Sequence, residues 1–209
     1  MFEDLPSLCP ATFFRLEGQL HHASEFIAKR GLKSPYLLPD TSELLSEDAF
    51  ADVGLGWNEK ALFCTVRVNK PFEESFFPDC VKGDSVELFI DTRNLRTASV
   101  TRFCHHFVFF PKDPPQEITK FRLEDSRPLA DPDDLILDVQ FGKKHYLLDI
   151  VISCDALHGY DPLDNPKITF TYRINRYRGD PQHFNLSSHE YDIEKHPSLW
   201  TEFSIKGNV

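Results

Sequence analysis

Hydrophobic and polar side chains alternate along much of this chain, as they do on a β-strand whose two faces have different surroundings. The clearest case is the stretch 84–91, with the sequence DSVELFID. Val86, Leu88 and Ile90 would face one side of this strand, whereas Glu87 would face the other. A carboxylate in mid-strand, opposite an aliphatic face, predicts a sheet with one side on a core and the other side lining a polar space.

The same alternation predicts further strands, and short polar turns at 58–60 and 142–144 predict two hairpins. The predicted strands cover residues 11–16, 52–57, 61–68, 84–91, 101–110, 134–141, 145–153, 168–177 and 200–205. Weak helical spacing covers 21–30, and loops are expected at 69–82, 111–133, 155–167 and 178–199. This pattern predicts an all-β, antiparallel β-sandwich of jelly-roll type, with long loops and at most short helices, as a single domain over 1–209.

Composition and charge narrow the class of protein. Phe (19) and Pro (15) are frequent and Gly (9) is scarce among the 209 residues, which favours strands joined by rigid turns. The formal net charge of −10 would repel phosphate backbones and anionic lipids, so we expect neither nucleic acid nor membrane as a partner. No secretion signal is evident, and the five scattered cysteines contain no CxxC motif, so we expect a cytoplasmic protein.

Two consecutive segments are similar to a known family. Residues 56–68 (GWNEKALFCTVRV), followed by 83–93 (GDSVELFIDTR), resemble the family-nine carbohydrate-binding modules, which belong to the wider DOMON-like group of β-sandwiches. Residues 170–176 (FTYRINR) and 196–203 (HPSLWTEF) resemble the last strands of that family. The likeness covers roughly residues 50–206 and implies the β-sandwich fold of these modules.

The resemblance also implies a sugar site. In the sugar-binding members two tryptophans sandwich the sugar, while a Glu on the DSVE strand and an Arg and an Asn on neighbouring strands hydrogen-bond its hydroxyls. Glu87 matches that Glu, Asn175 matches the Asn, and Arg102 is the candidate for the Arg. This chain departs from the pattern at Val81, where an aromatic residue is expected, and both of its tryptophans fall within strand patterns. Other DOMON-like domains hold haem between a Met and a His, and the single methionine here is Met1, so no haem is expected.

Alternation alone, without the family, also assembles a polar face. Its predicted members are Arg67, Glu87, Arg102, His106, Asp149, Arg173 and Asn175. Such a mixture of planar donors and acceptors suits vicinal hydroxyls or a carboxylate. Two interpretations remain open: a ligand-binding face, or a salt-bridged outer sheet surface covered by the 111–133 loop.

The sequence contains no clear metal-binding or catalytic motif. His105 and His106 are adjacent, so on a strand they would face opposite sides, and no HExxH spacing is present. The oxygen-rich runs Asp131/Asp133/Asp134 and Asp161/Asp164/Asn165 could hold calcium, which the family resemblance also implies as a structural ion, or could be solvated turn residues. No nucleophile elbow, Walker loop or Rossmann glycine run is found, so we do not expect an enzyme.

The leading hypothesis is therefore a non-catalytic module that binds a carbohydrate or similar polyol. The predicted ligand-binding residues are Glu87, Arg102, His106, Arg173 and Asn175. Glu87 would accept hydrogen bonds from hydroxyls, and the arginines would donate them. The alternative is a cytosolic protein-interaction module on the same fold whose polar face is only structural.

Overall fold

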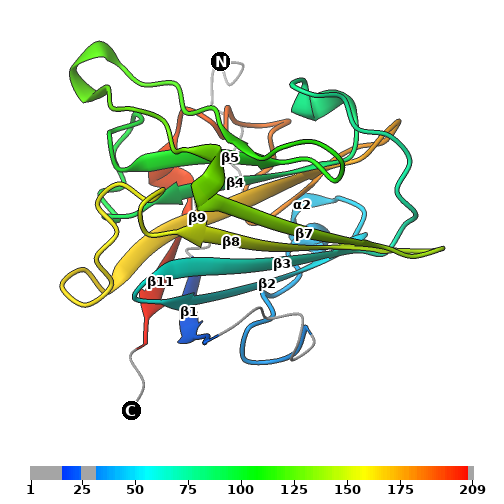
Figure 1. Cartoon of the computed structure of the whole chain (residues 1–209), viewed down its shortest axis with the longest axis horizontal. Helices are drawn as coiled ribbons and strands as arrows, with labels where there is room; N and C mark the ends of the chain where they lie inside the picture. The colour runs from blue at the N-terminus through cyan, green and yellow to red at the C-terminus, as the bar shows by residue number, and fades with distance from the viewer. Residues whose placement is uncertain (1–15, 25–31, 207–209) are drawn as a thin grey trace, which may run out of the picture.

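In the part of the chain that the structure describes, eleven strands form one continuous sheet that bends back on itself into two facing layers (Figure 1). The computed structural model describes residues 16–24 and 32–206. The first layer contains, in spatial order, β6 (Gln116–Glu117), β5 (Cys104–Phe109), β4 (Ser85–Asp91), β9 (Lys167–Asn175) and β11 (Thr201–Ile205), and β10 (Gln182–His183) also pairs with β9. The second layer contains β2 (Ala51–Asn58), β3 (Ala61–Val68), β8 (Tyr146–Ser153) and β7 (Leu135–Phe141).

A single strand, β1 (Glu17–His22), joins the two layers. Its first four residues pair with β11 and its last two pair with β2, and both pairings are parallel. The other strand pairs are antiparallel, as the hairpin signals predict. The prediction of an all-β sandwich is confirmed, with β1 as a parallel exception.

Helical segments in the described part of the chain are short, as expected. They are α2 (Ser42–Leu45) and the 3-10 turns η2 (Cys80–Lys82), η3 (Leu123–Asp125), η4 (Pro132–Asp134) and η5 (Pro197–Leu199). The predicted helical spacing over 21–30 is wrong at its start, because His21 and His22 belong to β1, and residues 25–31 lie outside the described residues. The predicted edge strand at 11–16 also falls almost entirely outside the described residues.

The main core lies between the two layers. Val86, Leu88 and Ile90 of β4 face this core, as the alternation predicts. Leu62 and Val66 of β3 do the same from the opposite layer. Burial of aliphatic faces on both layers provides the main driving force for this fold.

The outer face of the first layer is covered rather than open. Phe89 and Cys104 pack there against Leu186, Ile193 and Trp200, which lie in or just after the segment expected to be a polar loop. The indole Nε1 of Trp200 donates to the carbonyl of Ile193 at 2.9 Å, which fixes the segment in place. Both faces of β4 are consequently buried.

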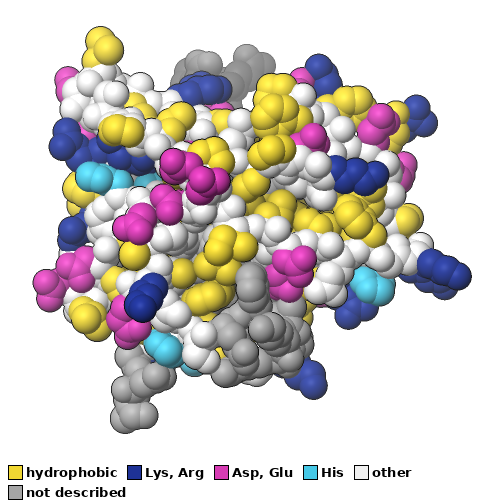
Figure 2. Space-filling view, viewed as in Figure 1, with side chains coloured by type: hydrophobic (Ala, Val, Ile, Leu, Met, Phe, Trp, Pro, Cys, Tyr) yellow, Lys and Arg dark blue, Asp and Glu magenta, His cyan; other side chains and the backbone are white. Residues whose placement is uncertain are grey.

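On the face seen in Figure 2, acidic, basic and hydrophobic side chains are interspersed, so that neither sign of charge dominates that face. In the described part of the chain, no helix has the length and apolar character needed to cross a membrane.

Candidate binding site

Glu87 lies at the centre of a group of polar side chains on the outer face of the first layer. The antiparallel register places Arg173 of β9 directly opposite Glu87 of β4, with Asn175 two residues further along β9. On the other side of β4, His106 of β5 lies opposite Phe89. Side chains two residues apart share a face of a sheet, so the pleat brings these polar groups together.

The carboxylate of Glu87 receives four hydrogen bonds from these neighbours. Arg173 donates two, from Nε to Oε1 at 2.6 Å and from Nη2 to Oε2 at 2.7 Å. Asn175 donates Nδ2 to Oε1 at 2.6 Å, and Nε2 of His106 lies 2.8 Å from Oε2. An ionised carboxylate has about four lone-pair positions, so the acceptor capacity of Glu87 is used up within the protein.

The charges in this group remain ionised although they are buried. Burial by itself would raise the pKa of Glu87, but hydrogen bonds from His106 and Arg173 outweigh it and lower that pKa to about 2. Burial likewise acts to lower the pKa of Arg173, and the Glu87 carboxylate outweighs it and raises the pKa. A buried ion pair is tolerated when its charges are paired and hydrogen-bonded, as those of Glu87 and Arg173 are here.

Glu87 faces away from the core, as predicted, but its side chain has no exposed surface. The expectation that it lines an open polar space is therefore wrong. The segments around Lys120 and Glu194 close over this part of the sheet, and the cross-strand partners of Glu87 occupy its remaining sides.

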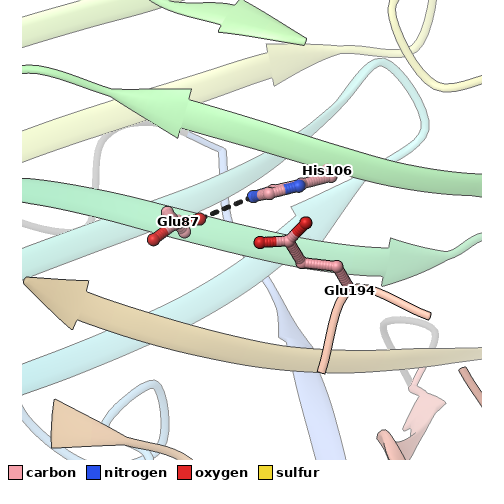
Figure 3. Close-up of side chains that lie close together, drawn as sticks. All are labelled: Glu87, His106 and Glu194. Atoms are coloured by element: carbon pink, nitrogen blue, oxygen red, sulfur yellow. Dashed lines mark hydrogen bonds and ion pairs between the residues drawn. The ribbon is translucent and has the colours of Figure 1, made fainter. Parts of the chain in front are cut away.

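Glu194 reaches the group from the segment before η5 (Figure 3). Its Oε1 accepts from Nη2 of Arg173 at 3.2 Å, and its Oε2 lies 3.6 Å from Nζ of Lys120. Within the described residues, Glu87, His106 and Glu194 are the three acidic or imidazole groups whose ligand atoms lie within 4.8 Å of one another. Because Arg173 already holds both carboxylates, and its positive charge would repel a cation, the geometry favours an ion-pair network over a metal centre.

A cavity of about 240 Å³ opens beside His106. Its apolar residues include Val100, Cys104 and Trp200, and its polar residues include His106, Thr119, Lys120, Arg122 and Glu194. Pockets for drug-sized ligands usually measure about 300–1,000 Å³, so this cavity suits a smaller molecule. The mixture of an aromatic residue with a few polar groups is typical of a small-ligand site.

The imidazole of His106 is held firmly at the cavity. Its ring stacks on Phe89 with centroids 4.2 Å apart, and its backbone N–H donates to Oγ1 of Thr119 at 2.8 Å. Because an ionised carboxylate can only accept, Nε2 of His106 carries the proton shared with Glu87. Nearby, burial raises the pKa of the Cys104 thiol to about 11, so this sulfur is not a thiolate at neutral pH.

Arg102 does not join the group, unlike the other four residues predicted to bind a ligand. The strand expected from 101 begins only at Cys104, because a turn closed by the bond from Cys104 N to Thr101 O precedes it. The side chain of Arg102 points to the η3 region, where Nη2 donates to the carbonyl of Glu124 at 3.2 Å.

Arg67 and Asp149 also lie elsewhere, on β3 and β8 of the second layer. Asp149 accepts a hydrogen bond of 2.6 Å from Thr65. The predicted single polar face is therefore wrong, because alternation shows which side of its own strand a residue occupies but not which layer holds the strand.

His105 points to the opposite side of β5 from His106, as the alternation predicts. Its Nδ1 lies 3.0 Å from Oε1 of Glu117, which also accepts from Nη2 of Arg127 at 2.6 Å. Burial lowers the pKa of His105, which keeps the imidazole neutral at physiological pH. This second buried network fastens the 111–133 segment to the sheet edge.

The two acidic runs form turns. Oδ1 of Asp131 accepts the N–H of Asp133 at 3.0 Å, and Oδ1 of Asp161 accepts the N–H of Asp164 at 3.2 Å. Asp131 and Asp161 therefore act as turn formers, and calcium binding by these runs stays a prediction.

Of the residues that line the cavity, only His106 was among the predicted ligand-binding residues, and those missed include Lys120, Glu194 and Trp200. Lys120 and Glu194 lie in irregular segments, where period-two alternation gives no information. Trp200 precedes β11 instead of beginning it, so its side chain is free to pack on the outer face. For Trp200, the signal available in the sequence was the tryptophan itself, because aromatic side chains are common in ligand sites.

The sequence matches no protein-family model and no curated protein. Solved structures are similar over nearly the whole chain. The family 9 carbohydrate-binding module from Caldicellulosiruptor kristjanssonii in complex with glucose shares 16% identity at a TM-score of 0.68, covering 94% of this chain and 97% of that one. The complex of a family 9 module from the same organism with cellotriose shares 16% identity at a TM-score of 0.64, covering 93% and 95%.

A proposed carbohydrate-binding protein from Bacteroides uniformis shares 11% identity at a TM-score of 0.58, with 92% and 99% coverage. At these identities the likeness concerns the fold. The chain has the fold of the family-nine modules, as its sequence motifs indicate.

Proposed function

We propose that this protein binds a carbohydrate in the cavity beside His106. The observation that carries the proposal is the cavity itself, which combines Trp200 with fixed polar groups at the outer face of β5. The similarity in fold to modules that hold glucose and cellotriose supports a sugar as the ligand. The volume of about 240 Å³ suits one sugar ring, free or at a chain end.

The residues of the site take different roles from those expected. Glu194 and Lys120 lie at the cavity and would accept from and donate to hydroxyl groups. Glu87 would not contact the sugar, because its carboxylate is fully engaged in hydrogen bonds with His106 and Arg173. We assign Glu87 the role of a positioning residue for His106.

In this proposal the cavity binds the sugar without catalysing a reaction on it. Cys104 is the thiol that lines it, and burial keeps that thiol protonated. His106 uses Nε2 to bond Glu87, so this nitrogen is not a free base toward the cavity.

Isothermal titration calorimetry with glucose, other monosaccharides and cellotriose tests the proposal. We expect at least one sugar to bind, and Glu194→Gln to weaken that binding about tenfold or more, because a hydrogen bond to a charged group contributes about 1.5–3 kcal/mol. Glu59→Gln is the matched control, since Glu59 is an exposed acid on the turn between β2 and β3 that does not line the cavity. Binding that is unchanged in Glu194→Gln, or no heat with any sugar, would overturn the proposal.

The second candidate, a cytosolic protein-interaction module, is favoured by one observation. Strand β7 lies at the end of the strand order and exposes Ile136 and Phe141 by about half of their surface, at 53% and 51%. An edge strand with exposed apolar residues can pair with a strand of another chain. No response across the sugar panel, together with a partner whose binding Ile136→Lys abolishes, would favour this function.

A further inference from the structure

A second constellation of polar groups lies outside the cavity, where β10 meets the segment after α2. Nδ1 of His183 is 2.7 Å from Oε1 of Glu47, and Nε2 of the same ring is 2.8 Å from Oγ of Ser188. His183 is fully buried, and the side chain of Glu47 is 7% exposed. A hydroxyl, an imidazole and a carboxylate thus form one continuous chain of hydrogen bonds.

The neighbouring backbone groups define the tautomer of His183. The backbone N–H of Ser188 points at Nε2 at 3.3 Å, so Nε2 carries a lone pair and no proton. The proton then resides on Nδ1 and is donated to Glu47, whose other oxygen accepts the backbone N–H of His183 at 2.9 Å. This is the tautomer that a general base next to a serine requires.

The serine is accessible at the surface. Ser188 is half-buried and lines a hollow of about 380 Å³, together with Arg173, His189 and Tyr191. The pairing of β10 with β9 sets His183 opposite Arg173, so the base and a fixed positive charge come from adjacent strands. Arg173 is already paired with Glu87 and Glu194, so activation of Ser188 depends on His183 and Glu47 and not on this charge.

We propose that Ser188 is an activated nucleophile for the hydrolysis of small acyl esters, with His183 as the general base and Glu47 as its positioning residue. Oγ of Ser188 bonds to the ester carbonyl carbon and its proton passes to Nε2 of His183. The ester C–O bond then breaks, and the leaving alcohol takes that proton. Water next attacks the acyl-serine and gives a proton to His183, and this proton returns to Oγ as the carboxylic acid leaves.

This activity is independent of the sugar cavity. Neither Ser188, His183 nor Glu47 lines that cavity, so a failure of sugar binding leaves the hydrolase site untouched. The competing interpretation is structural: the three residues would only tie the segment after β10 to α2. The two interpretations differ in whether Ser188 reacts with an electrophile.

A fluorophosphonate probe and p-nitrophenyl acetate distinguish them on the full chain. We expect the probe to label Ser188, located by mass spectrometry, and Ser188→Ala to abolish both labelling and ester turnover while the melting temperature stays within a few degrees. Ser126→Ala, which changes an exposed serine elsewhere, should leave both unchanged. Folded wild-type protein that takes up no probe at Ser188 and turns over the ester no faster than Ser188→Ala would overturn the proposal.

The role of Glu47 is tested separately, by measuring kcat and KM of a Glu47→Gln variant. Glu47→Gln should lower kcat at least tenfold and leave KM for p-nitrophenyl acetate unchanged, because the carboxylate orients His183 without contacting the ester. An equal kcat in a folded Glu47→Gln variant would remove Glu47 from the mechanism, and with it the basis for activating Ser188.

Discussion

At the scale of single residues, the account depends on Glu87. The alternation of β4 correctly predicts that this acid faces away from Val86 and Leu88. It does not predict that the acid is buried, because burial comes from Arg173 and Asn175 across the strand pair and from Glu194 in a segment more than 100 positions away in sequence. A strand pattern states which way a side chain points, whereas its exposure depends on the rest of the chain.

The carboxylates of Glu87 and Glu117 predict acid sensitivity. The pKa of each is lowered to about 2 in the folded state, so their stabilising contribution is complete above about pH 4.5 and is lost as the pH falls toward 2. We expect the free energy of unfolding, measured by urea denaturation, to fall across this interval by up to about 3 kcal/mol for each carboxylate. Burial raises the pKa values of Asp84 and Asp91. These two groups therefore reduce the free energy of unfolding as the pH rises above the pKa of an unfolded aspartate.

Glu87→Gln isolates the contribution of one group to this pH dependence. The variant should be less stable than wild type at pH 6, by about 3–5 kcal/mol, because Arg173 loses its buried counter-charge. Its stability should also decline less steeply between pH 4.5 and 2. Curves for wild type and variant that run parallel across that interval would show that the pKa of Glu87 is not lowered in the folded protein.

At the scale of the elements, the sequence predicts the strands that have one hydrophobic and one polar face. It misses the strands that are defined only by their hydrogen bonds to a neighbouring strand. The hairpins β2–β3 and β7–β8 and the central strands β4 and β9 lie within one or two residues of their predicted bounds. The two-residue strands β6 and β10 lie within expected loops, because they are too short to show a period. β1 pairs in parallel with strands of both layers, which no local pattern encodes.

The inner face of β4 makes a prediction about packing. Leu88 has no exposed surface and lies in the core between the layers, so Leu88→Ala should cost about 2–5 kcal/mol in the free energy of unfolding. Leu95→Ala is the matched control, since Leu95 is 48% exposed in the connection after β4, and we expect it to change stability by about 0.5 kcal/mol or less. Equal losses in the two variants, measured by urea denaturation, would contradict the assignment of Leu88 to the core.

At the scale of the whole molecule, the candidate site is assembled from three parts of the sequence. β5 and the connection before it supply the floor, the segment after β6 supplies Lys120, and the segment before β11 supplies Glu194 and Trp200. Four of the five residues predicted to bind a ligand were brought together, because alternation places them on one side of β4, β5 and β9, which are neighbours in the sheet, although of the five only His106 lines the cavity. The cavity itself could not be predicted, since its walls are irregular segments whose placement depends on long-range packing.

The most direct test of the central claim is a crystal structure of the protein with the sugar that binds best in the calorimetric panel. We predict that a single sugar ring occupies the cavity, within hydrogen-bond distance of Glu194 or Lys120, while the hydrogen bonds from Arg173 and His106 to Glu87 remain in place. A sugar bound on another surface, or one that reaches Glu87 directly after displacing Arg173, would contradict the account.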